Sequence, residues 1–324
     1  MNARYLGRKI VQSLVTIVAI VVLNFVLFRL MPGSPERILL RNPNLGPEVI
    51  EATRARWGLD KPVFPDQFAA YVGSTLQGDL GYSFKFRGRP VTDVILDRIG
   101  PTLMLAGLGE LIAIILGILI GAYSGWRRGS LLDRVGNGVS LVLYAMPYFV
   151  LGMPLIIIFG AGLHWFPTSG MTSVGGGDRS LPDALVDLAS HLALPLTTVS
   201  LGLIGGYSIL MRSAIIETRS EDYITTARAK GLSDGRVLRS HAMPNALLPM
   251  VTLFAIGLGV AIGGTFTAEV VFSWPGLGTL TVAALASRDY PLLQGIFLLL
   301  AVSVVVANLI ADLVYGYLDP RVRA

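Results

Sequence analysis

The 324-residue chain contains no cysteine, and charged residues make up only 15% of it. Without cysteine the protein cannot form disulfides, thiolate zinc sites, iron–sulfur clusters or a cysteine nucleophile. Soluble domains carry roughly 25% charged residues, so the low charge argues against an ordinary soluble domain. Hydrophobic residues reach 53%. They are gathered in long uninterrupted blocks, which is typical of membrane-spanning helices.

The sequence also lacks the motifs of an enzyme or of a nucleotide-binding protein. No His-Glu-x-x-His occurs, and His164, His191 and His241 are far apart along the chain, so we expect no metal site. No lysine follows a glycine, as a phosphate-binding P-loop requires. We therefore expect no catalytic residues and no cofactor held by this chain.

Six segments are long and apolar enough to cross a bilayer, which takes about 20 residues. They are Ile10–Phe28, Pro101–Tyr123, Val135–Leu163, Leu192–Met211, Ala246–Ala268 and Pro291–Ala311. Glu110 is the charged residue inside them, and we expect it to form a hydrogen bond between helices. Pro147 and Pro154 are expected to bend the third segment, and Gly117-x-x-x-Gly121 allows close helix approach.

Basic residues orient the predicted bundle, because short cytoplasmic loops retain lysine and arginine. With the N-terminus inside, most of these residues fall in the inner segments, whereas the two short outer loops hold one arginine each, Arg179 and Arg288. We therefore expect a multi-pass membrane protein, in contact with lipids, with both termini in the cytoplasm. This distribution explains the net charge of +5 without nucleic acid as a partner.

Residues 31–100 form a long hydrophilic segment that we expect to fold as a small extracytoplasmic cap. Pro47 can open one helix. A second stretch, Asp66–Gln77, is predicted to place four apolar residues on one face: Phe68, Tyr71, Val72 and Leu76. The cap is either a lid packed on the bundle or a docking surface for an extracytoplasmic partner, and the two interpretations are compatible.

The inner segment 212–245 has the pattern of a bent helical pair. Asp222–Lys230 favours a helix in which Ala227 and Ala229 are small enough for another surface to approach. Gly231 is expected to end this helix at a positive backbone angle.

The second half of this segment begins at Ser233, which is a good N-cap for a short helix running to His241. Pro244 is expected to end that helix and to start the next span. A solvated basic loop is the simpler alternative, but this order of small residues, glycine and proline favours a rigid docking device.

These residues resemble a known family. Thr226-Ala-Arg-Ala-Lys-Gly231, followed after nine residues by His241-Ala-Met-Pro-Asn245, is similar to the cytoplasmic EAA loop of binding-protein-dependent ABC importer permeases. Thr226 stands where that motif commonly has glutamate. Gly58-Leu-Asp-Lys-Pro62, Gly78-Asp-Leu-Gly-Tyr-Ser83 and Glu269-Val-Val-Phe-Ser-Trp-Pro-Gly-Leu-Gly278 resemble the B-type permease of dipeptide and oligopeptide importers. The resemblance covers nearly the whole chain.

The resemblance implies an all-α type I ABC importer permease fold in the bacterial cytoplasmic (inner) membrane. The expected divisions are an anchor helix (1–30), the cap (31–100), a five-helix transmembrane domain (101–314) and a cytoplasmic tail (315–324). The implied partners are a homologous second permease, two cytoplasmic ATPase domains that bind ATP and magnesium, an extracytoplasmic solute-binding protein and a peptide substrate. The ATPases would drive alternating access.

The resemblance also assigns roles to residues. The coupling segment (residues 212–245) would contact an ATPase domain through Asp222, Thr226, Ala227, Ala229, Gly231, His241, Met243, Pro244 and Asn245. Candidates for lining the path follow from the residues instead, because a weakly polar, uncharged wall would let varied peptides pass without trapping them. They are Pro147, Phe149, Thr252, Thr265 and Thr267. Candidates for docking the binding protein are Asp60, Asp79, Tyr82 and Trp274.

Two alternatives stay open from the sequence. The same architecture could import a nickel complex or glutathione, because the discriminating pocket of such systems lies largely in the binding protein. From another class, an ion-coupled transporter would use acidic or basic relays inside the bundle. Glu110 is a single charged residue, whereas such a relay usually needs several, so the sequence gives it little support.

Overall fold

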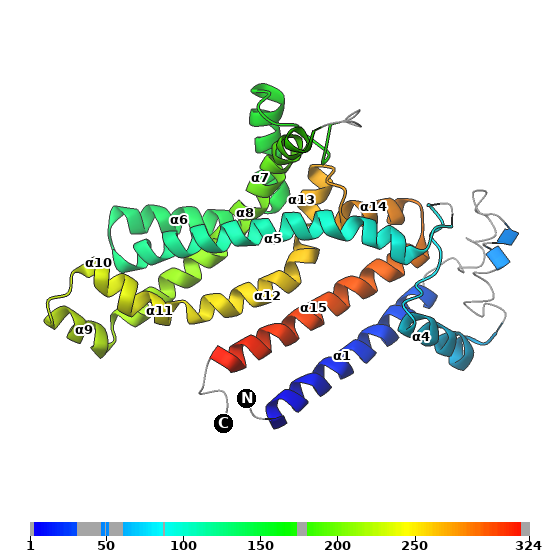
Figure 1. The fold of residues 1–324 in the computed structure, drawn as a ribbon, viewed down its shortest axis with the longest axis horizontal. Helices are drawn as coiled ribbons and strands as arrows, with labels where there is room; N and C mark the ends of the chain where they lie inside the picture. The colour runs from blue at the N-terminus through cyan, green and yellow to red at the C-terminus, as the bar shows by residue number, and fades with distance from the viewer. Residues whose placement is uncertain are drawn as a thin grey trace. The chain divides into compact units, whose positions relative to one another are not determined.

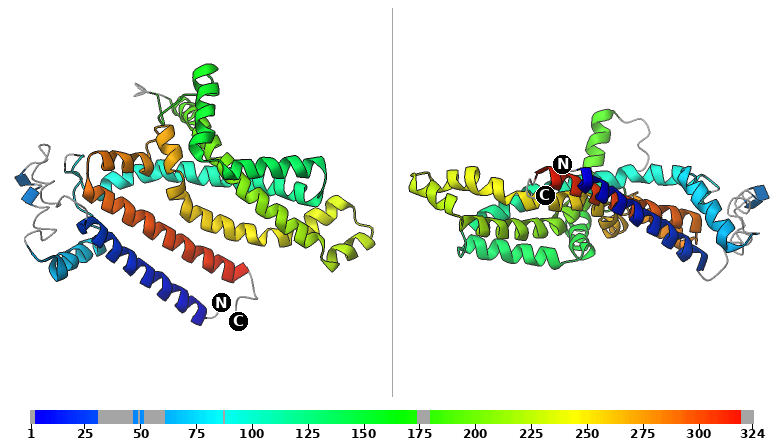
Figure 2. Two further views of the ribbon diagram at one scale, coloured as in Figure 1. Left: turned by 180° about the vertical axis from the view of Figure 1, so that it is seen from behind. Right: turned by 90° about the horizontal axis from the view of Figure 1, so that it is seen from below.

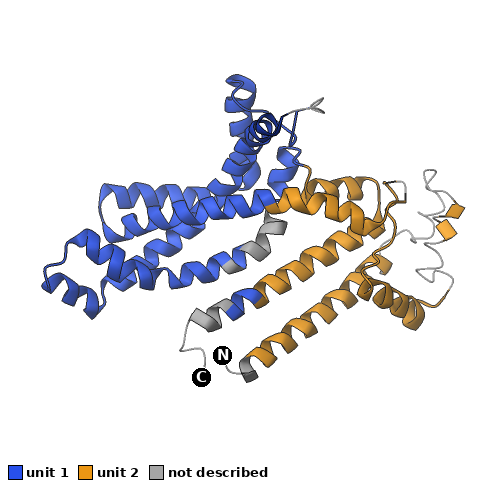
Figure 3. Cartoon of the chain, viewed as in Figure 1, with its two compact units in different colours: residues 1–2, 104–274, 310–324 blue, residues 3–103, 275–309 orange. Residues whose placement is uncertain are grey.

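The computed structural model describes residues 3–30, 47, 48, 50, 51, 61–86, 88–173 and 180–318. Within these residues the chain is helical, with an isolated antiparallel bridge between Tyr82 and Pro90 and no named strand. The predicted all-α fold is therefore confirmed. The chain divides into two compact units: residues 1–2, 104–274 and 310–324 form unit 1, and residues 3–103 and 275–309 form unit 2 (Figure 3).

The helices follow one another along the chain as Figures 1 and 2 show. They are α1 (Ala3–Leu30), η1 (Val63–Gln67), α4 (Phe68–Leu76), α5 (Val91–Trp126), α6 (Leu131–Ala145), α7 (Tyr148–Leu155), η2 (Ile156–Gly162), α8 (Leu181–Arg219), α9 (Asp222–Ala229), α10 (Asp234–Val237), η3 (Leu238–Ala242), α11 (Met243–Ala246), α12 (Leu248–Gly264), α13 (Phe266–Val271), α14 (Leu277–Ala286) and α15 (Tyr290–Leu318).

Four helices of the described chain are long and apolar enough to cross a membrane: Leu6–Arg29, Val91–Trp126, Leu181–Arg219 and Tyr290–Leu313. They contain the first, second, fourth and sixth predicted spans. A fifth is reached if the bent pair α6 and α7–η2 counts as one span. The count of six stays a prediction.

The third predicted span is sharply bent, as its prolines indicated. The helices on the two sides of Met146 and Pro147 meet at 103°. Met146 precedes a proline and is extended (φ −83°, ψ 127°), because the proline ring disfavours a helical residue before it. Pro154 lies inside α7, and the wider π-helical turns of η2 follow it.

The fifth predicted span was wrongly expected to be one continuous helix. The sequence Ala246–Ala268 is divided in the structure among the end of α11, α12 and the start of α13. Gly263 and Gly264 precede the break at Thr265, and glycine costs a helix about 1 kcal/mol relative to alanine.

Glycines let α5 and α8 pack closely in unit 1. A Cβ atom at Gly117 would overlap Tyr207, and one at Gly121 would overlap the Ser208 carbonyl. Helix α6 packs on α8 as well, where the Ser140 and Ser208 hydroxyls are 2.8 Å apart. The predicted close helix approach at Gly117 and Gly121 is confirmed.

Unit 2 contains residues 61–86 and 88–90 of the predicted cap, here called the cap segment, and the last predicted cap residues, 91–100, belong to α5. Phe25 of α1 contacts the rings of Phe68 and Tyr71 at centroid distances of 5.2 and 5.5 Å. Leu76, in contrast, is 83% exposed at the end of α4. Leu76 therefore takes no part in this packing, although its spacing of four residues from Val72 places both on one face of α4.

The predicted helix from Pro47 lies mostly outside the described residues. Pro47, Glu48, Ile50 and Glu51 are helical.

Candidate functional site

The coupling segment begins in the last turns of α8, and its first separate helix is α9 (Asp222–Ala229). Asp222 lies in the first turn and Arg228 in the last, which suits the helix dipole at both ends. The Thr226 hydroxyl donates to the Asp222 carbonyl at 3.0 Å. The predicted helix is confirmed to within one residue.

Gly231 turns the chain after α9. Its φ is 78°, and its N–H donates to the Arg228 carbonyl at 2.9 Å. A Cβ atom at this position would meet nothing within 4 Å. The requirement for glycine therefore comes from the left-handed backbone and not from lack of space, as predicted.

The return of the chain consists of three short pieces, α10, η3 and α11. Ser233 takes the N-cap position with an extended backbone, and its carbonyl accepts from the Arg236 and Val237 amides, but its side chain makes no capping bond. The predicted second helix to His241 is thus α10 continued by the π-helical η3. Pro244 lies in the first turn of α11, where its missing N–H is tolerated.

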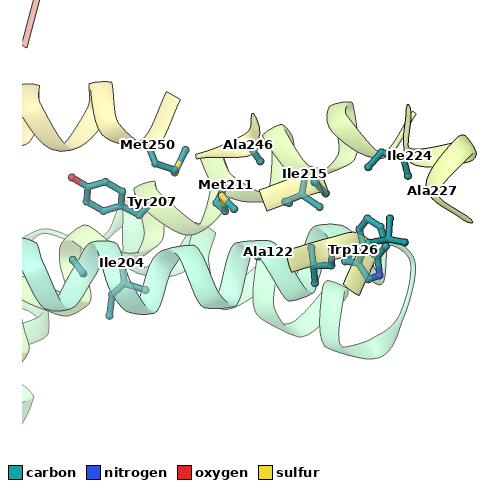
Figure 4. Packing of buried hydrophobic residues seen from close by; sticks show 14 residues of the cluster. Ala122, Trp126, Ile204, Tyr207, Met211, Ile215, Ile224, Ala227, Ala246 and Met250 are labelled. Atoms are coloured by element: carbon teal, nitrogen blue, oxygen red, sulfur yellow. The ribbon is translucent and has the colours of Figure 1, made fainter. Parts of the chain in front are cut away.

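Apolar side chains anchor the coupling segment to unit 1. Ile224 and Ala227 of α9 pack in one buried cluster with Trp126 at the end of α5 and Ile215 and Met211 of α8 (Figure 4). The returning pieces add Val237, Leu238, Ala242 and Ala246 to that cluster. Burial of one side chain such as Ile224 contributes about 1.5–3 kcal/mol. The segment is therefore part of the core of unit 1.

This packing contradicts the prediction made for Ala227. It is only 4% exposed and lies against the chain's own core, so it cannot receive another surface as predicted. Its spacing of three residues from Ile224 was the signal for a buried face.

An ion pair fixes the root of the coupling segment. Arg212 binds Asp133 of α6 with two bonds, Nε to Oδ1 at 2.6 Å and Nη2 to Oδ2 at 3.0 Å. Asp133 also accepts from the Ser124 hydroxyl and the Gly129 amide, both at 2.8 Å. The Asp133 side chain is 5% exposed and that of Arg212 is 23% exposed. This contact joins α8 to the α5–α6 turn.

Two arginines stack on Trp126. The guanidinium carbon of Arg228 lies 5.1 Å from the centre of the indole, and that of Arg219 lies 5.9 Å away. Arg219 also donates to the Trp126 carbonyl at 3.0 Å, and Arg228 lies 3.4 Å from the Asp234 carboxylate. Such cation–π contacts add about 0.5–2 kcal/mol each.

A side-chain hydrogen bond closes the coupling segment on itself. The Asn245 amide donates to the Tyr223 hydroxyl at 2.7 Å and reaches the His241 carbonyl at 3.4 Å. Sequence reasoning selected Asn245 and His241 but missed Tyr223, as it missed Asp133 and Trp126. These residues are distant in sequence from their partners, so no local spacing indicated them.

The remaining predicted coupling residues lie at the surface. Asp222, Thr226, Ala229, Gly231, Pro244 and Asn245 are exposed, and His241 and Met243 are half-buried. The segment thus combines a buried inner face with an uncovered outer face of mixed charge that another molecule can contact.

The predicted path residues come from three places in unit 1. Pro147 and Phe149 are exposed at the start of α7, whereas Thr252 of α12 and Thr267 of α13 are half-buried. Thr265 is only 2% exposed, and its hydroxyl donates to Glu269 at 3.2 Å. Thr265 therefore faces the protein interior in this conformation, contrary to the prediction.

The predicted docking residues differ in exposure. Asp79 is exposed and Tyr82 half-buried in the cap segment, and Asp60 lies outside the described residues. Trp274 was wrongly assigned to the surface. It is completely buried in unit 1 in a cluster with Leu105 and Leu192.

Comparison with known proteins gives the family. Residues 113–324 match the model of the binding-protein-dependent transport system inner membrane component, and residues 2–106 match the N-terminal model of such membrane components. The chain is 36% identical to a di/tripeptide transport system permease protein of Pseudomonas aeruginosa, over 98% of each chain. It is 34% identical to an oligopeptide transport system permease protein of Bacillus subtilis, over 99% of each.

A solved structure supports the fold. The chain resembles the inward-facing MetNI methionine ABC transporter with a TM-score of 0.57 at 15% identity, covering 70% of this chain and 96% of that one. The chain belongs to the binding-protein-dependent transport system inner membrane component family, whose members are permease subunits of ABC importers and not enzymes.

Proposed function

We propose that this chain forms half of the translocation path of an ATP-driven importer of dipeptides and oligopeptides, together with a homologous second permease. The names of the relatives from Pseudomonas aeruginosa and Bacillus subtilis, and of a dipeptide permease of Escherichia coli that is 35% identical, support peptides as the substrate class. They favour peptides over a nickel complex or glutathione.

The coupling segment is proposed to dock on a cytoplasmic ATPase subunit, which holds ATP and magnesium. The observation that carries this proposal is the anchoring of the segment: its inner face is buried in the core of unit 1, and its outer face is uncovered. Helix α8 leads into the coupling segment, and α11–α12 lead out of it. A displacement of the segment would therefore move two long helices. The bundle would have two arrangements, and contacts at the ATPase interface would favour one or the other. Switching between the two arrangements would give alternating access.

The cap segment is proposed to meet an extracytoplasmic solute-binding protein. Asp79 and Tyr82 support this role because they lie in the cap segment and are at least partly accessible. The proposed divisions at residues 30, 100 and 314 separate the anchor helix, cap, transmembrane domain and tail.

In the proposed topology, both termini and the coupling segment lie on the cytoplasmic side of a bacterial inner membrane. Reporter fusions at Arg128, Arg228 and the C-terminus are expected to report the cytoplasm. Fusions at Gln77 and Ser287 are expected to report the outside. A cytoplasmic signal at Gln77 would refute the proposed topology.

Reconstitution tests the function directly. The complex of this chain with its second permease and ATPases, in liposomes, is expected to take up a labelled dipeptide only when ATP and the loaded binding protein are both supplied. The chain alone is expected neither to hydrolyse ATP nor to transport. Uptake without ATP, or ATP hydrolysis by the isolated chain, would overturn the proposal.

A further inference from the structure

Glu110 is a buried acid in the middle of an apolar helix. It lies in α5 and is 1% exposed. An ionisable group at membrane depth is costly, and such groups generally line substrate or ion pathways. The proposed coupling to ATP does not use this residue, so its role needs a separate explanation.

The surroundings of Glu110 satisfy one carboxylate oxygen and leave the other available. Oε1 accepts a hydrogen bond from the Tyr207 hydroxyl of α8, which confirms the predicted bond between helices. Oε2 is buried and has no hydrogen-bond partner among the residues that the structure describes. An unsatisfied buried oxygen of this kind costs about 1–3 kcal/mol.

Helix α12 covers this carboxylate through a glycine. A Cβ atom at Gly257 would overlap the Glu110 carboxylate, so a side chain there would displace it. Glu110 of α5 thus lies where α8 and α12 meet that helix, between Tyr207 and Gly257.

Two of the helices around Glu110, α8 and α12, are attached to the coupling segment. Helix α8 runs from Tyr207 directly into that segment, and α11–α12 return from it to Gly257. A displacement of the segment therefore acts on the contact between Gly257 and Glu110. Withdrawal of α12, which lies nearest to Oε1, would uncover the Glu110 carboxylate to a molecule in the path.

The chemistry of this place selects a particular kind of ligand. A single carboxylate bonded to a tyrosine suits an organic ammonium group, which takes a charge-assisted hydrogen bond and can contact the aromatic ring. A divalent metal ion needs several oxygen or nitrogen ligands. The described residues contain no group of three His, Asp or Glu side chains placed to hold one.

We propose that Glu110 binds the protonated amino group of the transported peptide when α12 has withdrawn from it, with Tyr207 orienting the carboxylate. This inference rests on the proposed peptide import. The permease would then have a peptide-binding site of its own within the membrane, separate from the site of the binding protein.

The test compares Glu110→Gln with wild type in the reconstituted complex, using two alanine dipeptides, one with a free amino terminus and one N-acetylated. Glutamine keeps an acceptor for Tyr207 and removes the charge. Each variant-to-wild-type uptake ratio is taken at saturating binding protein, so the preference of that protein cancels. We expect uptake of the free-amine dipeptide to fall at least tenfold in Glu110→Gln and that of the acetylated one to stay within twofold.

The control is Glu269→Gln, which removes another fully buried carboxylate of unit 1. It is expected to change both peptides equally. Equal ratios for both peptides in Glu110→Gln would overturn the inference while leaving peptide import intact. Absence of dipeptide uptake by the wild-type complex would instead overturn the proposed substrate and, with it, the inference.

A measurement on the wild-type complex covers the case in which Glu110→Gln fails to assemble. A lipid-soluble carbodiimide is added to the complex during turnover, and modification of Glu110 is read by mass spectrometry. We expect the free-amine dipeptide to reduce this modification at least threefold and the acetylated dipeptide to leave it unchanged. Equal modification with both peptides would contradict a carboxylate–ammonium contact.

Discussion

The coupling segment and the cap segment are both polar insertions between long helices, but they are held in different ways. The coupling segment shares a buried apolar cluster with α5 and α8, reinforced by the Arg212–Asp133 pair. In the cap segment, the Ser83 hydroxyl and the Lys85 amide converge on one buried carboxylate, Asp289. The coupling segment is thus held by a buried apolar cluster and an ion pair, and the cap segment by ring contacts with α1 and hydrogen bonds to Asp289. Under the proposed function, the first would transmit a displacement and the second would present a surface.

The largest expected effect comes from breaking the ion pair at the root of the coupling segment. Asp133→Asn would leave the partly buried Arg212 without its charged partner, which costs about 3–5 kcal/mol. We expect the melting temperature of the purified complex to fall by several degrees and ATPase stimulation by the binding protein to weaken. An unchanged melting temperature would show that the coupling segment does not depend on this pair.

Gly231→Val is expected to have the next largest effect. A β-branched residue at a φ of 78° costs about 1–3 kcal/mol, and 1.4 kcal/mol already lowers the occupancy of an interface tenfold. ATPase subunits should be lost from the purified complex, or their activity should stop responding to the loaded binding protein.

The matched control for Gly231→Val is Gly235→Val. Gly235 lies in the same segment, also in open space, without a positive φ. We expect near-normal coupling in this variant. Equal loss of coupling in both variants would mean that any added side chain on this surface disturbs the ATPase interface, and that the backbone turn at Gly231 is not the cause.

In the cap segment, Ser83→Ala is expected to cost about 1 kcal/mol. It removes the hydroxyl that donates to Asp289 and accepts from the Phe86 amide, while Lys85 and Leu292 still donate to Asp289. Hydrogen exchange should accelerate around Lys85 and Phe86 with coupling unchanged.

The control for this variant is Ser287→Ala, which removes an exposed hydroxyl bonded to the Ala283 carbonyl of the same unit. Exchange around Lys85 should not change in it. Loss of ATP coupling in Ser83→Ala would contradict the distinction between the two segments.

The smallest effect is expected for Arg89→Ala at the edge of the cap segment. Arg89 lies 2.9 Å from Asp97, but both side chains are more than half exposed, and exposed pairs contribute about 0–1 kcal/mol. The melting temperature should stay within about one degree of wild type. A fall comparable to that of Asp133→Asn would show that exposure does not separate the two ion pairs.

Local sequence rules predicted those parts of the molecule that local physics decides. Gly231, the helix from Asp222 and the bend at Pro147 follow from backbone preferences of single residues, and the long apolar helices follow from their composition. The Arg212–Asp133 pair was not predicted, because its members are far apart in sequence and many other charges could have paired. Trp274 was misplaced because tryptophan suits a docking surface and a core equally well.

The position of Tyr207 along α8 has a mechanical consequence. Tyr207 is hydrogen-bonded to Glu110 and packed on Gly117, and it lies midway between Pro195 inside α8 and Arg219 at the helix end. Each half is about 18 Å long at 1.5 Å per residue. Between Tyr207 and Arg219, the helix is also held at Arg212 by Asp133 of α6. Under the proposed function, a displacement received at Arg219 would therefore be shared with α6 before it reached the contact between Tyr207 and Glu110.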